Sequence, residues 1–155
     1  MQDHEQHSQS DYILSDDLSA IDWWRLANIM ADAHLFDRKP FDIARAFHGS
    51  YAAVFAFKGD LLVGAARATS DGVFYASVFD VVVAPDHQRN GVGRLIMEGL
   101  LVKLPFDRIF LTSVFGKEPF YSKFGFLEQT NAMGCYSGDA LKSAIQRGVL
   151  QHAND

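Results

Sequence analysis

The segment FDVVVAPDHQRNGVGRLIMEG, from Phe79 to Gly99, combines a strand, a glycine-bearing loop and a helix. Its β-branched run through Val83 predicts a buried strand, which ends before Pro85 because proline cannot donate to a strand ladder. From Val92 onward, apolar residues recur at three- and four-residue spacing, which predicts a helix. A glycine loop between a strand and a helix leaves several backbone N–H groups pointing outward, at the positive end of the helix dipole. This arrangement favours an anion, most naturally a phosphate.

The residues expected to form the anion site follow one another in the chain. They are Gln88, Arg89, Asn90, Gly91, Val92, Gly93 and Arg94. Both arginines add positive charge to the rim. No GxxxxGK[ST] motif occurs, and Ile96 stands where a GxGxxG fingerprint requires its third glycine. Taken alone, these residues leave two alternatives open: a plain turn with a packing glycine, and a nucleotide-binding domain.

The loop resembles the Q-x-x-G-x-G coenzyme A pyrophosphate loop of the GNAT N-acetyltransferases, and a second segment supports the resemblance. FYSKFGF, from Phe120 to Phe126, resembles the F-Y-x-x-x-G-F helix that lies beside the coenzyme in that family. The two motifs occur in the family's order. The resemblance covers most of residues 12–136 and implies an α/β (α+β) GNAT fold. That fold has a mixed central sheet of six to seven strands, splayed between the fourth and fifth strands, and about four flanking helices.

Length and composition are those of one globular domain. The chain has 155 residues, of which 48% are hydrophobic and 21% charged. We expect a disordered leader at residues 1–10 and a single domain at residues 11–150. No apolar run reaches the roughly 18 residues of a membrane span, and no export signal is present. A net charge of −5 without a basic block disfavours nucleic acid as a partner.

The single cysteine, Cys135, excludes an internal disulfide and makes the cytoplasm the default location. We expect it to be a small buried hydrophobe rather than a nucleophile.

Apolar periodicity and turn residues predict the order of the elements. The expected strands are residues 12–14, 51–57, 61–69, 73–83, 108–114, 126–128 and 133–136. The expected helices begin near Ser19, at Pro40 and at Val92, followed by a short helix around Tyr121 and a terminal helix at residues 140–147.

Acetyl transfer from a thioester to an amine involves two proton transfers and the stabilisation of one negative charge. The attacking amine must lose a proton, the oxyanion needs a donor, and the departing thiolate benefits from a proton. The resemblance implies that Tyr121 is the general acid toward sulfur, although a tyrosine packed against the sheet is the plainer interpretation. It also implies that backbone N–H groups of Val81, Val82 and Val83 bind the thioester carbonyl and the pantetheine amides.

Asp80 interrupts an apolar strand, and a carboxylate there requires a partner or a role. It either accepts the proton of the amine, directly or through water, or binds a cationic acceptor. The alternative is a structural role, as an ion pair with an arginine such as Arg67 or as a hydrogen bond at the strand edge. The sequence does not favour one of these roles over the other. Glu118 is a weaker candidate base, and related enzymes often rely on solvent instead.

Three further residues are expected to contact the coenzyme. The family often has an asparagine before the FY helix; here Ser113 occupies that region and substitutes for it, while Lys117 and Lys123 contact phosphates. By the same resemblance, Trp24, Phe79 and Asp80 contact the acceptor. Core packing is the alternative for Trp24, and simple solvation the alternative for the lysines.

The resemblance implies an acetyl-CoA-dependent N-acetyltransferase without a metal, which moves acetyl to a small-molecule primary amine by direct attack in a ternary complex. Residues 67–83 are similar to the plant and cyanobacterial serotonin N-acetyltransferase branch, as is MGCY at residues 133–136. A protein or peptide amine is an alternative acceptor, and a non-catalytic coenzyme A-binding module is an alternative function. Neither nucleic acid nor membrane is expected as a partner, and a homodimer through C-terminal strands is common in the family.

Overall fold

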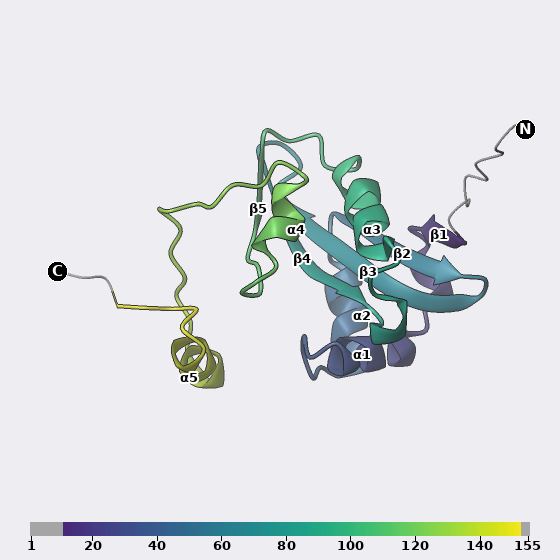
Figure 1. Ribbon diagram of the computed structural model, residues 1–155, viewed down its shortest axis with the longest axis horizontal. Coiled ribbons are helices and arrows are strands. Elements are labelled where there is room, and N and C mark those ends of the chain that lie inside the picture. The colour runs from purple at the N-terminus through teal and green to yellow at the C-terminus, as the bar shows by residue number, and fades with distance from the viewer. Residues whose placement is uncertain (1–10, 153–155) are drawn as a thin grey trace, which may run out of the picture. The chain divides into compact units, whose positions relative to one another are not determined.

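A five-stranded mixed sheet forms the centre of the fold (Figure 1), in the spatial order β1-β2-β3-β4-β5. The computed structural model describes residues 11–152; the leader expected at residues 1–10 lies outside this range. The strands are β1 (Tyr12–Ser15), β2 (Ala52–Lys58), β3 (Leu61–Ser70), β4 (Tyr75–Val83) and β5 (Arg108–Leu111). The first four pair antiparallel, and β5 joins β4 in parallel. The predicted α/β class and strand order are confirmed for these five strands.

Residues 11–152 contain five α-helices: α1 (Trp23–Asp32), α2 (Pro40–His48), α3 (Val92–Leu101), α4 (Glu118–Ser122) and α5 (Gly138–Gln146). Short 3₁₀ turns precede α1 (η1, Leu18–Ala20) and α3 (η2, Pro85–His87). The first helix therefore begins later than predicted, because the Asp22 carboxylate accepts the Arg25 N–H at 3.0 Å and caps α1 there. The predicted start of α2 at Pro40 is confirmed, and Gly49 stands at its C-terminal cap.

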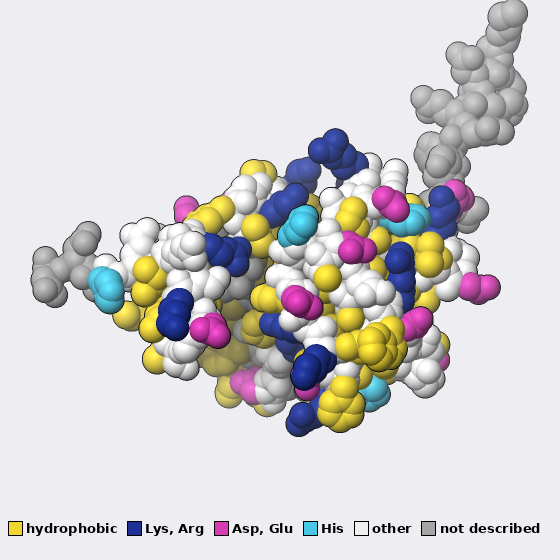
Figure 2. Space-filling model, turned by 90° about the horizontal axis from the view of Figure 1, so that it is seen from below, with side chains coloured by type: hydrophobic (Ala, Val, Ile, Leu, Met, Phe, Trp, Pro, Cys, Tyr) yellow, Lys and Arg dark blue, Asp and Glu magenta, His cyan; other side chains and the backbone are white. Residues whose placement is uncertain are grey.

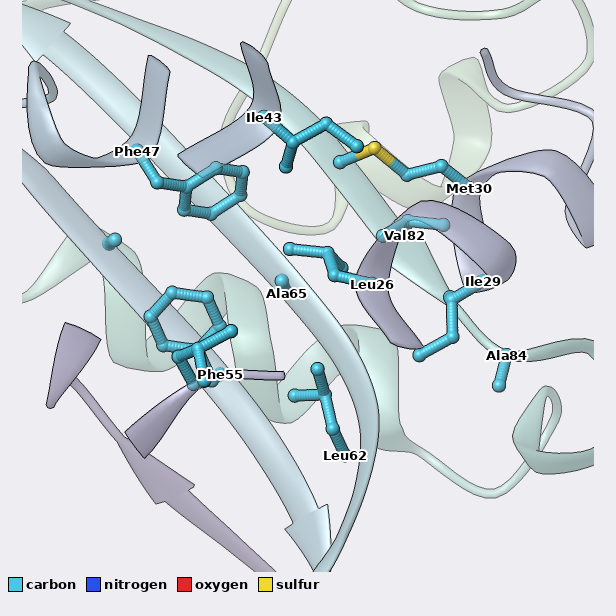
Figure 3. Close-up of a cluster of buried hydrophobic side chains, with 12 residues drawn as sticks. Leu26, Ile29, Met30, Ile43, Phe47, Phe55, Leu62, Ala65, Val82 and Ala84 are labelled. Atoms are coloured by element: carbon cyan, nitrogen blue, oxygen red, sulfur yellow. The ribbon is translucent and has the colours of Figure 1, made fainter. Parts of the chain in front are cut away.

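Helices α1 and α2 pack on one face of the sheet, and α3 packs on the other (Figure 1). Side chains of a strand point alternately to the two faces of the sheet. Phe55 of β2 points to the face covered by α1 and α2. Figure 3 shows Leu26 of α1 beside Ala65 of β3, and Met30 of α1 extended toward Ile43 of α2. The Phe47 and Phe55 rings lie 5.4 Å apart. On the other face of the sheet, the buried residues of α3 are Val92, Ile96, Met97 and Leu100.

The close approach of α3 to the sheet depends on Gly64. A Cβ at this position would lie 2.7 Å from the Val82 carbonyl oxygen and 2.8 Å from Ile96 Cδ1. We expect Gly64→Ala to lower stability by about 1–3 kcal/mol, because a backbone oxygen cannot move aside cheaply. Thermal unfolding checks this prediction. Gly49→Ala is the control, since its nearest neighbour would be 3.4 Å away; an equal loss in both variants would contradict the packing argument.

The described chain divides into two compact units, one ending at Phe124 and the other beginning at Gly125. The second unit contains α5, and its residues 126–137 form no strand, so the prediction of six to seven strands is wrong for the described residues. Leu127 and Met133 are 90% and 94% exposed, and no described strand pairs with this segment. A short strand without a ladder partner is not stable. Cys135 is exposed rather than buried.

Strands β4 and β5 part from each other beyond Val78. The parallel ladder joins Tyr75–Val78 to Arg108–Leu111, and β4 then continues alone to Val83. The fifth strand is shorter than predicted because residues 112–114 leave the ladder. The predicted parting between the fourth and fifth strands is therefore present, and it exposes one edge of β4.

Candidate active site

A cleft of about 970 Å³ opens where β4 continues past the end of β5. The exposed edge of β4, the loop before α3, the helix α4 and the connection between α1 and α2 line it. Most residues predicted for the site border this cleft: Phe79–Val83, Gln88–Arg89, Gly91–Arg94, Lys117, Tyr121 and Lys123. Segments far apart in the sequence thus meet at one cleft.

The loop before α3 presents open backbone N–H groups. Gly91 adopts a left-handed conformation (φ 78°) at the N-cap of α3, and no side chain caps this helix start. Within residues 11–152, no protein acceptor bonds the backbone N–H groups of residues 89–94. The Gln88 side chain instead ties the loop to β4 by donating to the Val83 carbonyl at 3.1 Å. Uncapped N–H groups at a helix N-terminus form an anion site.

Gly93 also has a packing role. A Cβ at this position would lie 3.3 Å from Phe120 Cζ, so α4 approaches the first turn of α3 closely. This contact brings the helix carrying Tyr121 beside the anion loop.

Charge along the α3 side of the cleft is mainly positive. Arg89, Arg94, Lys117 and Lys123 border it, against one carboxylate on the same side, Glu98. Arg94 Nε donates to Glu98 Oε1 at 2.7 Å, and this contact raises the pKa of the arginine. On the molecular face in Figure 2, by contrast, Lys and Arg are interspersed with acidic and hydrophobic side chains. Three or more cations beside open N–H groups suit a polyanion such as a diphosphate.

Tyr121 lies on α4 and borders the cleft, with its side chain half-buried. Burial raises the pKa of its phenol, because a low-dielectric surrounding disfavours the phenolate. The ring meets Phe120 edge to face at 5.0 Å. Glu118, the weaker candidate base, accepts the Gly116 N–H at 2.8 Å and does not border the cleft.

Asp80 is held by two arginines. Its Oδ2 accepts from Arg67 Nε at 2.6 Å, and its Oδ1 accepts from Arg38 Nη1 at 3.1 Å. The ion pair with Arg67 that the sequence left open is therefore confirmed. The contact with Arg38 was missed, because this arginine lies 42 positions away in the connection between α1 and α2 and carries no motif.

Three predicted residues do not border the cleft: Trp24, Asn90 and Ser113. Trp24 is 74% exposed, whereas the neighbouring Trp23 packs on Phe47 and Phe55. The Asn90 side chain turns back to the His87 carbonyl, and the Ser113 hydroxyl donates to the Val114 carbonyl.

The cleft also includes residues that the sequence did not indicate. They are Ala33, His34, Leu35, Val78, Glu98, Val114, Phe120 and Phe124. Only Phe120 and Phe124 had a signal, as part of FYSKFGF. The connection at residues 33–35 follows a helix without any motif, so nothing local marks it as a wall of the site.

A parted mixed sheet with open N–H groups beside the gap defines the acetyltransferase class of fold. A family profile described as "Acetyltransferase (GNAT) domain" matches residues 37–135. The chain therefore belongs to the GNAT acetyltransferase family.

Curated relatives match parts of the chain. The uncharacterized N-acetyltransferase ycf52 of Porphyra purpurea is 39% identical over 75 residues, which cover 46% of this chain and 43% of that protein. Serotonin N-acetyltransferase 2, chloroplastic, of Oryza sativa subsp. japonica is 55% identical over 42 residues, or 27% of this chain and 21% of that protein. The chain thus spans less than half the length of these relatives.

Among solved structures, a probable acetyltransferase from meticillin-resistant Staphylococcus aureus superposes with a TM-score of 0.73 at 19% identity. The match covers 82% of this chain and 98% of that one. This structural similarity supports the assignment of the fold. No helix within residues 11–152 combines the length and apolarity needed to cross a bilayer.

Proposed function

We propose that the chain is an acetyl-CoA-dependent N-acetyltransferase for a small-molecule primary amine. The observation that carries the proposal is the set of open backbone N–H groups at the start of α3, beside the exposed edge of β4 and Tyr121 in one cleft. The loop and its cations fit the diphosphate of coenzyme A. The edge of β4 then offers hydrogen bonds to the pantetheine arm and to the thioester carbonyl.

Transfer proceeds by direct attack in a ternary complex. The neutral amine nitrogen attacks the thioester carbonyl carbon, a C–N bond forms, and the oxyanion is stabilised by backbone N–H groups of β4. The C–S bond then breaks, the nitrogen loses its proton to solvent, and the Tyr121 hydroxyl protonates the leaving thiolate. Solvent restores the proton of Tyr121. Binding both reactants in one cleft supplies a large share of the acceleration.

A small amine fits the acceptor side better than a folded protein does. The cleft has a limited volume, and Phe79 is 40% exposed on its wall, which suits a ring or an alkyl chain. The name of the matched rice protein makes arylalkylamines the first acceptors to test.

The decisive experiment measures thiol release from acetyl-CoA with a panel of amines: serotonin, tryptamine, spermidine, glucosamine, an amino acid and a peptide with a free N-terminus. Release that depends on one small amine supports the proposal. Release with the peptide alone assigns a peptide acceptor instead, and acetyl-CoA binding without release assigns a non-catalytic binding module.

We expect acetyl-CoA to raise the melting temperature, because a ligand bound only by the folded state stabilises it. At 100 times the dissociation constant the gain is about 2.7 kcal/mol. Thermal unfolding with acetyl-CoA, coenzyme A and ATP checks this prediction. Protection by ATP alone would favour a nucleotide-binding domain and would contradict the coenzyme assignment.

A further inference from the structure

We propose that Asp80 is a positioning residue, which with Arg67 and Arg38 locks a bulge in β4 and so aims the backbone donors of the strand edge into the cleft. The inference rests on the proposed function for its kinetic consequence. It selects the ion-paired role of Asp80 over a direct role as base.

Strand β4 contains a bulge at Asp80. In the ladder with β3, Ala65 pairs with Val82 and Arg67 pairs with Phe79, so Asp80 and Val81 together oppose the single residue Ala66. Asp80 has a left-handed backbone (φ 55°). Few residues other than glycine adopt this conformation, and aspartate and asparagine tolerate it best. Bulges of this kind bend a strand and change the direction of its donors.

The bulge is fixed through the Asp80 side chain. Its carboxylate is 4% exposed, and both oxygens accept from guanidinium groups at 2.6 and 3.1 Å. Burying a charge is costly unless it is paired, and removing one partner of a buried pair is strongly unfavourable. The conformation of Asp80 and its two ion pairs therefore depend on each other.

Each arginine is itself held in place. The Arg67 guanidinium lies 5.2 Å from the Phe79 ring centroid and 5.9 Å from that of Phe47, and its Nη1 donates to Ser50 Oγ at 3.4 Å. Arg38 lies over the Phe36 ring at 3.7 Å. One arginine thus comes from the sheet, and the other from the α1–α2 connection that walls the cleft.

Two consequences follow for the reaction. In a strand, alternate N–H groups point to opposite neighbours, so beyond the end of β5 those on its side face the cleft. Because the bulge adds one residue to β4 opposite β3, it sets which N–H groups of residues 79–83 point into the cleft. Both carboxylate oxygens accept from arginines and the Asp80 side chain is only 4% exposed, so Asp80 is poorly accessible to the acceptor amine. The charged groups facing Asp80 are Arg67 from β3 and Arg38 from the connection, and His34 borders the same cleft.

The test uses Asp80→Asn and Arg38→Met, singly and together, in the full chain. Asparagine keeps the tolerance for a left-handed backbone and removes the charge; methionine keeps the length of Arg38, which at 39% exposure is the less buried arginine. Asp16→Asn is the matched control, because it breaks the Asp16–Lys103 ion pair away from the cleft. The measurements are hydrogen exchange of residues 79–83, and kcat with its pH profile for acetyl-CoA and tryptamine.

A positioning role predicts about tenfold faster exchange at residues 79–83 in both single variants and about tenfold lower kcat. The double variant should show no faster exchange and no lower kcat than either single variant. The acidic limb of the pH profile of kcat should stay in place. The control Asp16→Asn should match the wild type in both measurements. A loss of about 100-fold or more with disappearance of that limb would assign Asp80 as the base and overturn the proposal. Unchanged exchange in both variants would overturn it as well. If the wild type transfers nothing to tryptamine, hydrogen exchange still decides the role of the bridge, while the amine panel decides the function.

Discussion

Tyr121→Phe should reduce kcat about 100-fold while changing acetyl-CoA affinity by less than about twofold. The substitution removes a single oxygen, and general acid catalysis typically contributes at least this factor. The phenyl ring keeps the contact with Phe120, whose ring lies 5.0 Å away, so α4 should keep its place beside α3. Steady-state kinetics with the best amine of the panel and calorimetric titration of acetyl-CoA measure the two effects separately.

Tyr51→Phe is a suitable control for this variant. Tyr51 is also partly exposed, at 48%, and it packs against Phe106 outside the cleft. Its hydroxyl has no role in the proposed transfer, so kcat should match the wild type. Equal losses of kcat and of coenzyme affinity in Tyr121→Phe would remove the phenol from the role of acid and assign it to coenzyme binding.

The pH dependence follows from the burial of Tyr121. Because burial raises the pKa of the phenol, the protonated form needed for an acid persists above the usual tyrosine value of about 10. Activity that depends on this proton is therefore present at neutral pH and falls only as the pH rises through the raised pKa. A Tyr121-dependent loss of kcat between pH 7 and 9 would contradict the assignment.

Local signals made the first unit predictable. The Val81–Val83 run, the glycine loop and the apolar period from Val92 each lie within a few residues, and each formed the expected element. The turn between the strands expected at residues 51–57 and 61–69 also formed, with Gly59 in a left-handed conformation (φ 58°) between β2 and β3. The strands predicted within residues 126–137 did not form. Local composition favours a strand there, but a strand also requires a hydrogen-bonded neighbour, which the local sequence does not reveal.

The site was predictable where a motif lies on one element, and not where it depends on contacts between elements. The sequence indicates both the loop at residues 88–94 and Tyr121, and all of these residues except Asn90 border the same cleft. The resemblance places Trp24 on the acceptor side, but Trp24 is 74% exposed and lies outside the cleft. One step along a helix turns a side chain by about 100°, so Trp24 does not share the buried direction of Trp23. Arg38 had no local pattern, since its role exists only once the α1–α2 connection reaches β4.

Gly91→Val should abolish acetyl-CoA binding, with affinity at least about 100-fold weaker, equivalent to about 2.7 kcal/mol. Gly91 has a φ of 78°, and a β-branched residue is a severe outlier in that region. Apart from its chain neighbours, no atom of the described residues would lie within 4 Å of a Cβ at this position. The effect must therefore come from the altered direction of the N–H groups and from the side chain standing where the diphosphate lies. Calorimetric titration of acetyl-CoA measures the loss.

Gly59→Val separates this effect from backbone strain. Gly59 is also left-handed, at φ 58°, and an added Cβ there would also have open space among residues 11–152, apart from its chain neighbours. It lies in the β2–β3 turn, however, and does not border the cleft. Both variants should lose a similar amount of stability, about 1–2 kcal/mol for an unfavourable left-handed residue. Only Gly91→Val should lose the coenzyme. If the two variants bind acetyl-CoA equally well, the diphosphate does not lie at the N-terminus of α3, and the proposed orientation of the thioester along β4 loses its anchor.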